Sequence, residues 1–362
     1  MTRHERFMAL ALEEARKGLG RTSPNPPVGA VIVRDGAVVG AGHHSFAGGP
    51  HAEAEALAAA GDAARGGDLY VTLEPCDHLG RTPPCAPAVA GAGIARVFIG
   101  ATDPNPIVSG RGIRRLREAG LQVETGVLGA ACEALIEGWS LFIRAGRPWV
   151  VAKVASTLDG RIATASGDAR WITGEGARAR VHRLRSEVDA VIVGRGTVIA
   201  DDPALTARIP GGRDPLRVIL DSRLSVSPTA RVFARGSAAG AIAACIGPAD
   251  PDRAAALRGA GAEVLECEAV DGRVALEPLL RGLAARGVVQ VLVEGGAGVF
   301  GAFLEAGLVD RLLLHYGPKV FGGGPAWANG PVAARVADAL GFRIEAAELV
   351  DGDLVVDARP LR

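Results

Sequence analysis

The chain contains Pro50-His51-Ala52-Glu53, then Thr72-Leu73-Glu74-Pro75-Cys76, and then Gly80-Arg81-Thr82-Pro83-Pro84-Cys85. These segments bring together one imidazole, from His51, and two thiols, from Cys76 and Cys85. Such a donor set suits a catalytic zinc ion, because three protein ligands leave the fourth tetrahedral position open for water. Zinc lowers the pKa of that water to about 7, and the carboxylate of Glu53 can carry the released proton to a leaving group. The spacing therefore predicts a metal-assisted hydrolytic site.

His51 and Glu53 are two residues apart, and residues at that spacing do not share a face in the middle of a helix. Both side chains can reach one pocket only from the opening turn of a helix, and Pro50 favours a helix start at this point. His-x-Glu alone is a weak signal, but its conjunction with a strand, Pro75-Cys76 and a second cysteine is a strong one. The remaining cysteines have no neighbouring ligand pattern and are expected to be ordinary buried residues: Cys132, Cys245 and Cys267.

The first part of the chain alternates helical and strand patterns. A helical rhythm over 5–17 precedes an apolar strand at 28–33, which the turn Asp35-Gly36 joins to Val38 and Val39 as a hairpin. Further helices are predicted at 52–60, 113–119 and 130–143, and further strands at 69–73, 95–100 and 121–125. This alternation predicts an α/β fold with a mostly parallel sheet.

Ala145-Gly146-Arg147-Pro148 interrupts the pattern, and we place a domain boundary there, giving domains 1–146 and 147–362. After it the pattern starts afresh as a second α/β domain. Helices are predicted at 177–187 and 276–286. Strands are predicted at 150–155, 190–193, 216–220, 241–246, 263–267, 288–293 and 312–316.

Late in the second domain, a strand runs into Glu294-Gly295-Gly296-Ala297-Gly298-Val299-Phe300-Gly301. A strand that stops at glycines opening a helix is suited to phosphate, because backbone N–H groups and the helix dipole favour an anion there. Gly296, Gly298 and Gly301 match the dinucleotide pattern G-x-G-x-x-G, but no acidic residue stands at the distance that would hold a ribose hydroxyl. From these residues alone, the presence and the absence of a nucleotide-binding site are about equally well supported.

The composition limits the class of protein. With 362 residues, 48% hydrophobic and 22% charged, the chain is long enough for about two globular domains. Lys+Arg and Asp+Glu are 40 each, so zero net charge argues against binding to nucleic acid through phosphate contacts. The sequence lacks a targeting segment and a run of eighteen apolar residues, which argues against membrane association. Five cysteines fit a reducing compartment, so we expect a cytoplasmic protein.

His-x-Glu followed by Pro-Cys and a further Cys resembles the zinc-dependent cytidine and deoxycytidylate deaminases. Eight residues separate Cys76 from Cys85, and this longer insert resembles the bifunctional riboflavin-biosynthesis deaminase/reductase family. The same resemblance extends to Pro24-Asn25-Pro26-Pro27-Val28-Gly29, Asp103-Pro104-Asn105-Pro106 and Gly110-Arg111-Gly112-Ile113. It implies a cytidine-deaminase-like domain in which His51, Cys76 and Cys85 bind Zn2+ and Glu53 is the catalytic proton carrier. It also implies that Asn25 and His44 lie near the substrate.

The second domain resembles the reductase half of the same family, which has a dihydrofolate-reductase-like fold and uses NADPH. The strings that carry this resemblance include Lys153 to Gly160 and Val193-Gly194-Arg195-Gly196-Thr197. The resemblance implies cofactor contacts from Ala155, Trp171, Thr197, Asp201, Ser222, Gly296, Ala297, Gly298, Val299, Phe300, Gly301 and Ala302. It implies substrate contacts from Ala169, Arg185, Leu205, Arg208 and Glu294. Arg185 and Arg208 suit a sugar phosphate, which a guanidinium binds through two hydrogen bonds.

The resemblance implies hydrolytic deamination of a diaminopyrimidinone ribosylamine 5′-phosphate, then reduction of its ribosyl group to ribityl. Phe46, Gly49 and Ala169 depart from the residues common in the family, which puts the corresponding substrate contacts in question. Two alternatives stay open: a different nucleobase deaminase acting on RNA, and a non-catalytic zinc-stabilised module with His78 as a fourth ligand. The sequence leaves open whether the protein forms a homo-oligomer and which group is the general acid of the reductase.

Overall fold

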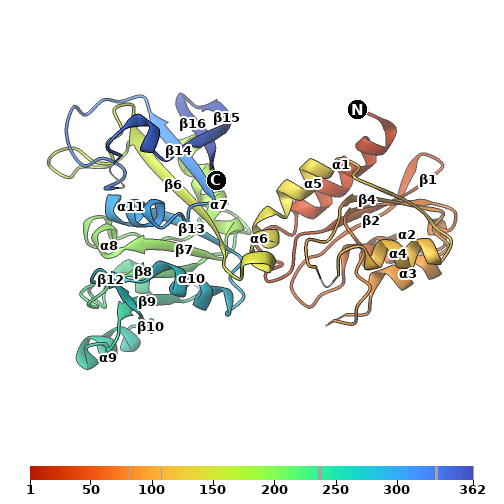
Figure 1. The fold of residues 1–362 in the computed structure, drawn as a ribbon, viewed down its shortest axis with the longest axis horizontal. Coiled ribbons are helices and arrows are strands. Elements are labelled where there is room, and N and C mark those ends of the chain that lie inside the picture. The colour runs from red at the N-terminus through yellow and green to blue at the C-terminus, as the bar shows by residue number, and fades with distance from the viewer. Residues whose placement is uncertain (81, 107, 235–238, 331–332, 362) are drawn as a thin grey trace. The chain divides into compact units, whose positions relative to one another are not determined.

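The computed structural model describes residues 1–362 apart from 81, 107, 235–238, 331–332 and 362. Arg81 of the quoted motif therefore lies outside the described residues. The chain divides into two compact units, Met1–Gly146 and Arg147–Arg362 (Figure 1). None of the helices in the described part of the chain combines the length and the apolar character that a membrane span requires.

The N-terminal unit holds a five-stranded sheet in the order β2-β1-β3-β4-β5. The strands are β1 (Gly29–Arg34), β2 (Ala37–His43), β3 (Asp68–Leu73), β4 (Arg96–Ala101) and β5 (Gln122–Thr125). β3, β4 and β5 are parallel, whereas β1 is antiparallel to both of its neighbours. The expectation of a mostly parallel sheet is therefore wrong for half of the strand pairs. The predicted hairpin is confirmed, and its two-residue turn at Asp35 and Gly36, both with positive φ, can join only antiparallel strands.

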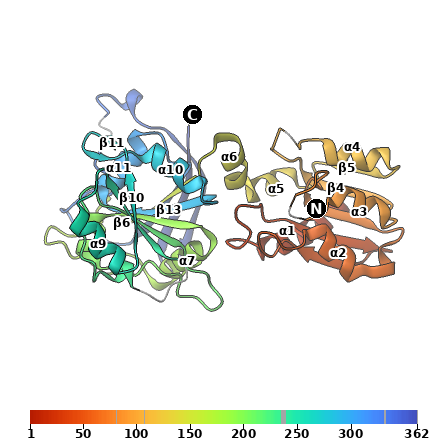
Figure 2. The ribbon, with the colours of Figure 1, turned by 90° about the horizontal axis from the view of Figure 1, so that it is seen from below.

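Helices cover both faces of this sheet (Figures 1 and 2). Apolar residues of the sheet, of α2 (Ala52–Ala60), of α3 (Cys85–Gly91) and of α4 (Arg111–Glu118) form one core cluster. α1 (Arg3–Arg16) and α5 (Gly129–Leu135) lie on the opposite face. The single helix expected over 130–143 is two helices, α5 and α6 (Glu137–Ala145), because Ile136 leaves helical geometry with φ −106° and ψ 10°.

The C-terminal unit is built on a nine-stranded sheet in the order β10-β9-β8-β7-β13-β6-β14-β16-β15. Its strands are β6 (Trp149–Thr157), β7 (Ala190–Gly194), β8 (Leu216–Leu220), β9 (Ala241–Ile246), β10 (Glu263–Cys267), β13 (Gln290–Gly295), β14 (Arg311–Gly317), β15 (Phe342–Val350) and β16 (Asp353–Pro360). The predicted strands 216–220, 241–246 and 263–267 are confirmed at both ends. The terminal hairpin of β15 and β16 was not predicted, because β15 is almost wholly exposed and its sequence lacks a buried apolar face.

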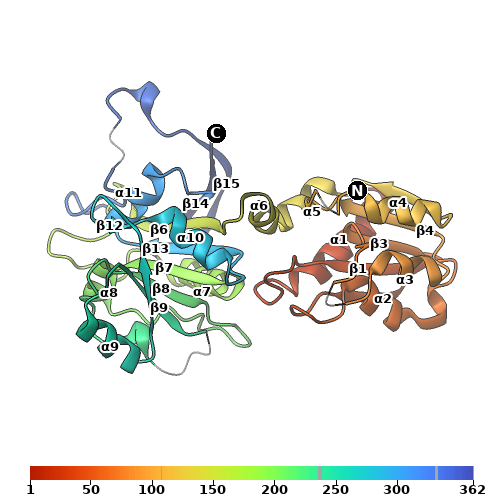
Figure 3. The ribbon, with the colours of Figure 1, turned by 60° about the horizontal axis from the view of Figure 1, so that its bottom comes forward.

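Helices lie on both faces of this sheet (Figure 3), and each face carries its own apolar core. α10 (Leu276–Ala284) and α11 (Ala297–Glu305) contribute to one core, and α8 (Arg195–Asp201) and α9 (Pro251–Gly259) contribute to the other. A short pair, β11 (Ala269–Val270) and β12 (Arg273–Val274), precedes α10, and α7 (Glu175–Glu187) connects β6 to β7.

The adjacent strands β7 and β13 mark a change of direction in the chain's path. From β7 the chain goes through α8 to β8 on one side, and from β13 it goes through α11 to β14 on the other. Ligands of open α/β sheets bind outside the carboxyl ends of the strands at such a switch point. The topology therefore positions a binding site at the ends of β7 and β13.

Candidate functional site

The three predicted zinc ligands converge in the N-terminal unit. His51 is the residue that precedes α2, Cys76 follows β3, and Cys85 is the first residue of α3. His51 Nδ1 lies 3.6 Å from Cys76 Sγ and 3.3 Å from Cys85 Sγ. Tetrahedral zinc, with bonds of about 2.3 Å to sulfur and 2.0 Å to nitrogen, holds such ligands about 3.6 Å apart. Among the described residues, these three form the one His/Cys/Asp/Glu group that is close enough to hold a metal ion. The donor set and its spacing therefore fit zinc.

The surroundings of the ligands also suit a metal. His51 Nε2, on the far side of the ring from the thiols, lies 3.1 Å from Thr82 Oγ1, a contact that fixes the ring orientation. A hydrogen bond with the Cys85 thiol lowers the pKa of Cys76, which favours the thiolate form that a zinc ligand requires. His78 is exposed and lies outside the group, which argues against a fourth protein ligand from this residue.

Glu53 lies in the first turn of α2, so the predicted start of the helix at this motif is confirmed. Its side chain is buried, and burial raises the pKa of Glu53 to about 7. A carboxyl group that titrates near neutral pH can both accept and return a proton, which is what a proton carrier requires.

Asn25 and His44 meet beside the metal ligands. Buried His44 has its Nδ1 2.9 Å from the carbonyl oxygen of Pro50, to which it donates, so its Nε2 accepts from the Asn25 side-chain amide at 3.0 Å. The His44 and His51 rings are 5.3 Å apart in an edge arrangement. This chain of hydrogen bonds fixes the Asn25 amide and leaves its oxygen as an acceptor at the site.

Glu74 and Gly112 position the segment that carries Cys76. The buried carboxylate of Glu74 accepts hydrogen bonds from the backbone N–H groups of Asp103, Gly110 and Ile113 at 3.0–3.2 Å. Gly112 packs so closely on this segment that a Cβ there would lie 1.8 Å from the carbonyl oxygen of Pro75. These contacts give the Asp103–Asn105 and Gly110–Ile113 strings a structural role that sequence analysis did not assign.

Phe46 and Gly49 contact each other. The Phe46 ring is 57% exposed and covers Gly49, where a Cβ would lie 2.9 Å from the ring. The two residues that depart from the family pattern here are therefore packing partners, because the missing side chain at Gly49 leaves room for the Phe46 ring.

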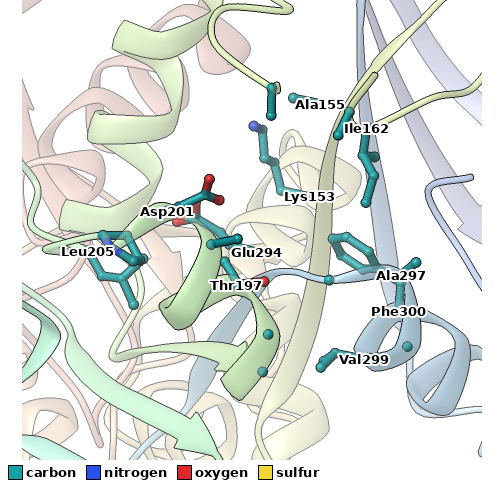
Figure 4. Close-up of a pocket in the computed structure, with 18 of the residues that line it drawn as sticks. Lys153, Ala155, Ile162, Thr197, Asp201, Leu205, Glu294, Ala297, Val299 and Phe300 are labelled. Atoms are coloured by element: carbon teal, nitrogen blue, oxygen red, sulfur yellow. The ribbon is translucent and has the colours of Figure 1, made fainter. Parts of the chain in front are cut away.

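The C-terminal unit contains a cavity of about 1220 Å³ at the switch point of its sheet (Figure 4). Its walls include the ends of β6, β13 and β7 and the first turns of α8 and α11. Eight of the lining residues are cationic and three are acidic, which favours anionic ligands. The cations are Lys153, Arg170, Arg178, Arg185, Arg195, Arg208, Arg231 and Arg273, and the acids are Asp201, Asp202 and Glu294.

Glycines bring the walls of the cavity close together between β7 and β13. A Cβ at Gly295 would lie 2.9 Å from Thr197 Oγ1, and a Cβ at Gly194 would lie 2.7 Å from the Val299 side chain. Gly296 precedes α11 with φ +82°, a conformation that favours glycine. The space beside the first turn of α11, around Gly298, is open. This cradle of backbone N–H groups at a helix N-terminus fits the phosphates of a dinucleotide.

Most of the residues expected at the cofactor or the substrate line this cavity. They are Ala155, Ala169, Trp171, Arg185, Thr197, Asp201, Leu205, Arg208, Ser222, Glu294, Gly296, Ala297, Gly298, Val299, Phe300 and Ala302. Gly301 does not line it, and a Cβ there would instead lie 2.0 Å from the carbonyl oxygen of Asn329. Gly301 thus allows α11 to pack on the Asn329 segment.

Arg185 forms an ion pair with Glu294 and does not present a free guanidinium to a phosphate. Its Nε and Nη2 donate to the two Glu294 carboxylate oxygens at 2.6 and 2.8 Å, and Nη1 donates to the Thr206 carbonyl at 3.1 Å. Burial alone would raise the pKa of Glu294, but the charge and hydrogen bonds of Arg185 outweigh it and lower that pKa. Arg208 is exposed, and within the described part of the chain its guanidinium makes one side-chain hydrogen bond, to Thr206 Oγ1 at 3.3 Å, so it is less committed to protein partners than Arg185.

Lys153 is a cavity residue to which sequence analysis gave no role. It projects from β6 into the same cavity as Glu294 and Thr197 (Figure 4). Burial lowers the pKa of Lys153 to about 8, although the Glu294 charge acts in the opposite direction. The signal in the sequence was a lysine in the middle of an otherwise apolar strand, where a charge is costly unless it has a function.

Comparison with known proteins assigns each unit to a family. Residues 1–101 match the cytidine and deoxycytidylate deaminase zinc-binding region, and residues 148–355 match the RibD C-terminal domain. The chain is 45% identical over 320 residues to the riboflavin biosynthesis protein RibD of Bacillus amyloliquefaciens, covering 88% of this chain and 85% of that protein. It is 40% identical over 351 residues to RibD of Aquifex aeolicus, covering 97% and 96%.

Solved structures agree with these sequence matches. A Thermotoga maritima protein described as a diaminohydroxyphosphoribosylaminopyrimidine deaminase/5-amino-6-(5-phosphoribosylamino)uracil reductase has a TM-score of 0.89 and 40% identity, with 99% of each chain covered. RibD of Acinetobacter baumannii has a TM-score of 0.87 and 37% identity, also over 99% of each chain. A zinc-binding deaminase region, a RibD reductase domain and this similarity along the chain show that the protein belongs to the RibD family of bifunctional riboflavin-biosynthesis enzymes.

Proposed function

We propose that the chain catalyses two successive steps of riboflavin biosynthesis. The N-terminal unit would deaminate 2,5-diamino-6-ribosylamino-4(3H)-pyrimidinone 5′-phosphate by hydrolysis. The C-terminal unit would then use NADPH to reduce the ribosyl group, giving 5-amino-6-ribitylamino-uracil 5′-phosphate. The observation that carries the proposal is the zinc-type triad beside buried Glu53, in a chain whose other unit holds a cationic cavity at a sheet switch point.

In the deaminase unit, His51, Cys76 and Cys85 would hold the zinc ion, which supplies hydroxide at neutral pH. Glu53 would take the proton of the attacking water and return it to the departing amine, since its pKa of about 7 allows both transfers. Asn25 would orient the pyrimidine through its side-chain amide, which His44 holds in place. Water thus adds at the amine-bearing carbon, and ammonia leaves from it.

In the reductase unit, NADPH supplies the hydride, and the residues around the cavity position the sugar and supply a proton. Arg208 would bind the 5′-phosphate, while the Arg185–Glu294 pair would present a fixed carboxylate to the sugar hydroxyls. Because Arg185 keeps Glu294 ionised, Lys153 is the neighbouring group that carries a proton at neutral pH. We therefore assign the role of proton donor, which the sequence left open, to Lys153.

The working compartment is the cytoplasm in this proposal. All five cysteines are free thiols, and two of them are the proposed zinc ligands, which need a reducing environment.

One incubation tests both activities. The purified, zinc-loaded full chain is mixed with the diaminopyrimidinone ribosylamine phosphate and NADPH, and ammonia and the nicotinamide absorbance are followed together. Release of ammonia with loss of NADPH supports both steps. Ammonia without NADPH loss would contradict the reductase assignment, and neither signal from metal-replete protein would contradict the substrate. A tRNA substrate run in parallel tests the alternative of an RNA deaminase.

A further inference from the structure

Helix α7 forms one wall of the cavity in the C-terminal unit. Four of its residues line the cavity: Arg178, Val181, His182 and Arg185. They recur at spacings of three and four residues, so they share one face of the helix. The end of this face is fixed by Arg185, which is paired with Glu294. The position of Arg178, nearer the start of the helix, therefore depends on what holds the first turn of α7.

The residues at the start of α7 do not cap the helix themselves. The residue that precedes the helix is Gly174, which has no side chain to accept a hydrogen bond. In a capping box, a Glu or Gln at the third helical position accepts from the N–H of the capping residue, but α7 has Ala177 there. The first N–H groups of a helix have no partner within it, so this end of α7 needs an acceptor from elsewhere.

A carboxylate of the terminal hairpin of β15 and β16 supplies that acceptor. Asp353 is the first residue of β16 and is 1% exposed. Its Oδ2 accepts a hydrogen bond from the N–H of Gly174 at 2.7 Å, although 179 positions separate the two residues in the sequence. A negative charge is also favourable beside the positive end of the helix dipole. Asp353 therefore provides from a distant strand the cap that the local sequence of α7 lacks.

Two more acidic side chains of the hairpin contact α7. Asp351 is in the hairpin turn, and its carboxylate fills the space beside Gly176, where a Cβ would lie 2.1 Å from Oδ2. Glu348 of β15 accepts from both terminal nitrogens of Arg180. Gly176 and Arg180 are four residues apart, so the face of α7 that meets the hairpin is not the face that lines the cavity. Of the three acidic groups, Asp353 is the buried one, and exposed ion pairs contribute little.

The first turn of α7 holds the cavity segment that precedes it. Arg178 Nη1 donates to the Thr173 carbonyl oxygen at 2.6 Å, and its guanidinium lies 4.6 Å from the centre of the Trp171 ring. Trp171, Ile172 and Thr173 line the cavity together with Arg178. A shift in the start of α7 would therefore move both an arginine and a loop that face the bound substrates.

We propose that Asp353 is a positioning residue of the reductase, which holds the start of α7 and thereby aligns Arg178 and the Trp171–Thr173 segment with the substrate. Asp353 does not line the cavity, so it acts only through the helix. None of the described residues of β15 and β16 lines the cavity, and this role connects their hairpin to the reaction. The inference rests on the proposed reductase function.

Steady-state kinetics of the full-length, zinc-loaded protein test this role, with the deaminated intermediate and NADPH as substrates. Asp353→Ala removes the acceptor of the Gly174 N–H. We expect kcat/KM for the intermediate to fall by about 10- to 100-fold, because a misplacement of about 1 Å costs up to about 100-fold. Asp353→Asn keeps an oxygen that can accept the same hydrogen bond, and it should restore kcat/KM to within about fivefold of the wild type.

Two matched variants separate this contact from general damage to the hairpin. Glu345→Ala removes a carboxylate of β15 that is paired with Arg343 of its own strand, and it should leave the reduction unchanged. Arg180→Gln breaks the exposed pair with Glu348 and should change kcat/KM by less than about threefold.

Two further readouts separate positioning from a loss of folded protein. Nicotinamide fluorescence should show that Asp353→Ala binds NADPH with the stoichiometry of the wild type, and ammonia release by the N-terminal unit should keep its rate. Amide hydrogen exchange of Asp353→Ala should be faster over residues 172–180 and unchanged in the rest of the C-terminal unit.

Several outcomes would overturn the role of Asp353 and leave the reductase function standing. They are wild-type kinetics or unchanged hydrogen exchange in Asp353→Ala, a lack of rescue by Asp353→Asn, and a loss of NADPH-binding sites that matches the loss of rate. The last of these would make Asp353 a residue that acts on stability alone. Absence of reduction by the wild type would overturn the reductase function itself, and the exchange measurement would then still decide whether Asp353 holds the start of α7.

Discussion

Gly112→Ala provides a sharp test of how the zinc site is held in place. Gly112 is in the first turn of α4, and a Cβ there would lie 1.8 Å from the Pro75 carbonyl oxygen and 3.3 Å from Glu74 Cγ. The closest approach that real Cβ atoms show is 3.0 Å, so α4 and the Pro75–Cys76 segment must separate by at least about 1.2 Å. The obstacle is backbone, which cannot rotate away as a flexible side chain could.

The displaced segment carries the Cys76 ligand, so the effect should reach the metal. A misplacement of about 1 Å costs on the order of 100-fold in rate when it affects reacting groups. We therefore expect Gly112→Ala to lower deamination by about 100-fold and to reduce the zinc bound per chain. Reduction of the already deaminated intermediate should be unchanged, because its cavity is in the other unit.

The assay compares ammonia release, zinc content by atomic emission, and NADPH oxidation with the deaminated intermediate as substrate. Gly91→Ala is the matched control, since Gly91 is in α3 and a Cβ there meets no atom within 4 Å. That variant should keep full deaminase activity. A Gly112→Ala protein with a full zinc complement and wild-type deamination would refute the argument that close packing of Gly112 on Pro75 positions Cys76.

Four further changes have defined outcomes. Glu53→Gln should retain zinc but lower the rate of deamination by about 100- to 10,000-fold, while reduction of the deaminated intermediate stays intact. Loss of reduction as well would contradict the assignment of the two reactions to independent sites. Thr82→Val should weaken zinc binding by about 10- to 100-fold in a chelator competition, because the His51 ring loses its orienting contact. Arg147→Met should cost the C-terminal unit about 3–5 kcal/mol in urea unfolding, because it leaves the buried Asp310 carboxylate without its two guanidinium hydrogen bonds at 2.6 and 2.8 Å; an unchanged midpoint would contradict this. Lys153 has a pKa of about 8 in the folded protein and about 10.4 in the unfolded chain, so between these pH values the unfolded chain holds the extra proton and the free energy of unfolding rises with pH. Relative to Lys153→Met, the wild type should gain about 1–3 kcal/mol in free energy of unfolding from pH 7 to pH 10.5. Parallel pH profiles of the two proteins would contradict this expectation.

Local patterns predicted much of the secondary structure, because they depend on residues close in sequence. The helix at 52–60 and three strands of the C-terminal unit agree at both ends with the structure. Two errors have physical reasons. The hairpin turn at Asp35 and Gly36 was identified, yet its consequence for strand direction was overlooked when the sheet was expected to be mostly parallel. β15 was missed because a strand exposed along its length carries no alternation of buried and solvent-facing residues.

The donor set for zinc and the resemblance to a two-domain deaminase and reductase could be read from the residues alone, because ligand types and short motifs need no coordinates. Only the folded chain shows which polar side chains are already paired with other groups of the protein. Arg185 is paired with Glu294, Asp221 with its own loop, and Glu74 with three backbone N–H groups, although each could have served as a ligand. Such partners are remote in the chain or depend on the path of a turn, so no local pattern encodes them. Folding therefore left Lys153, Arg195 and Arg208 as cavity residues available to a ligand.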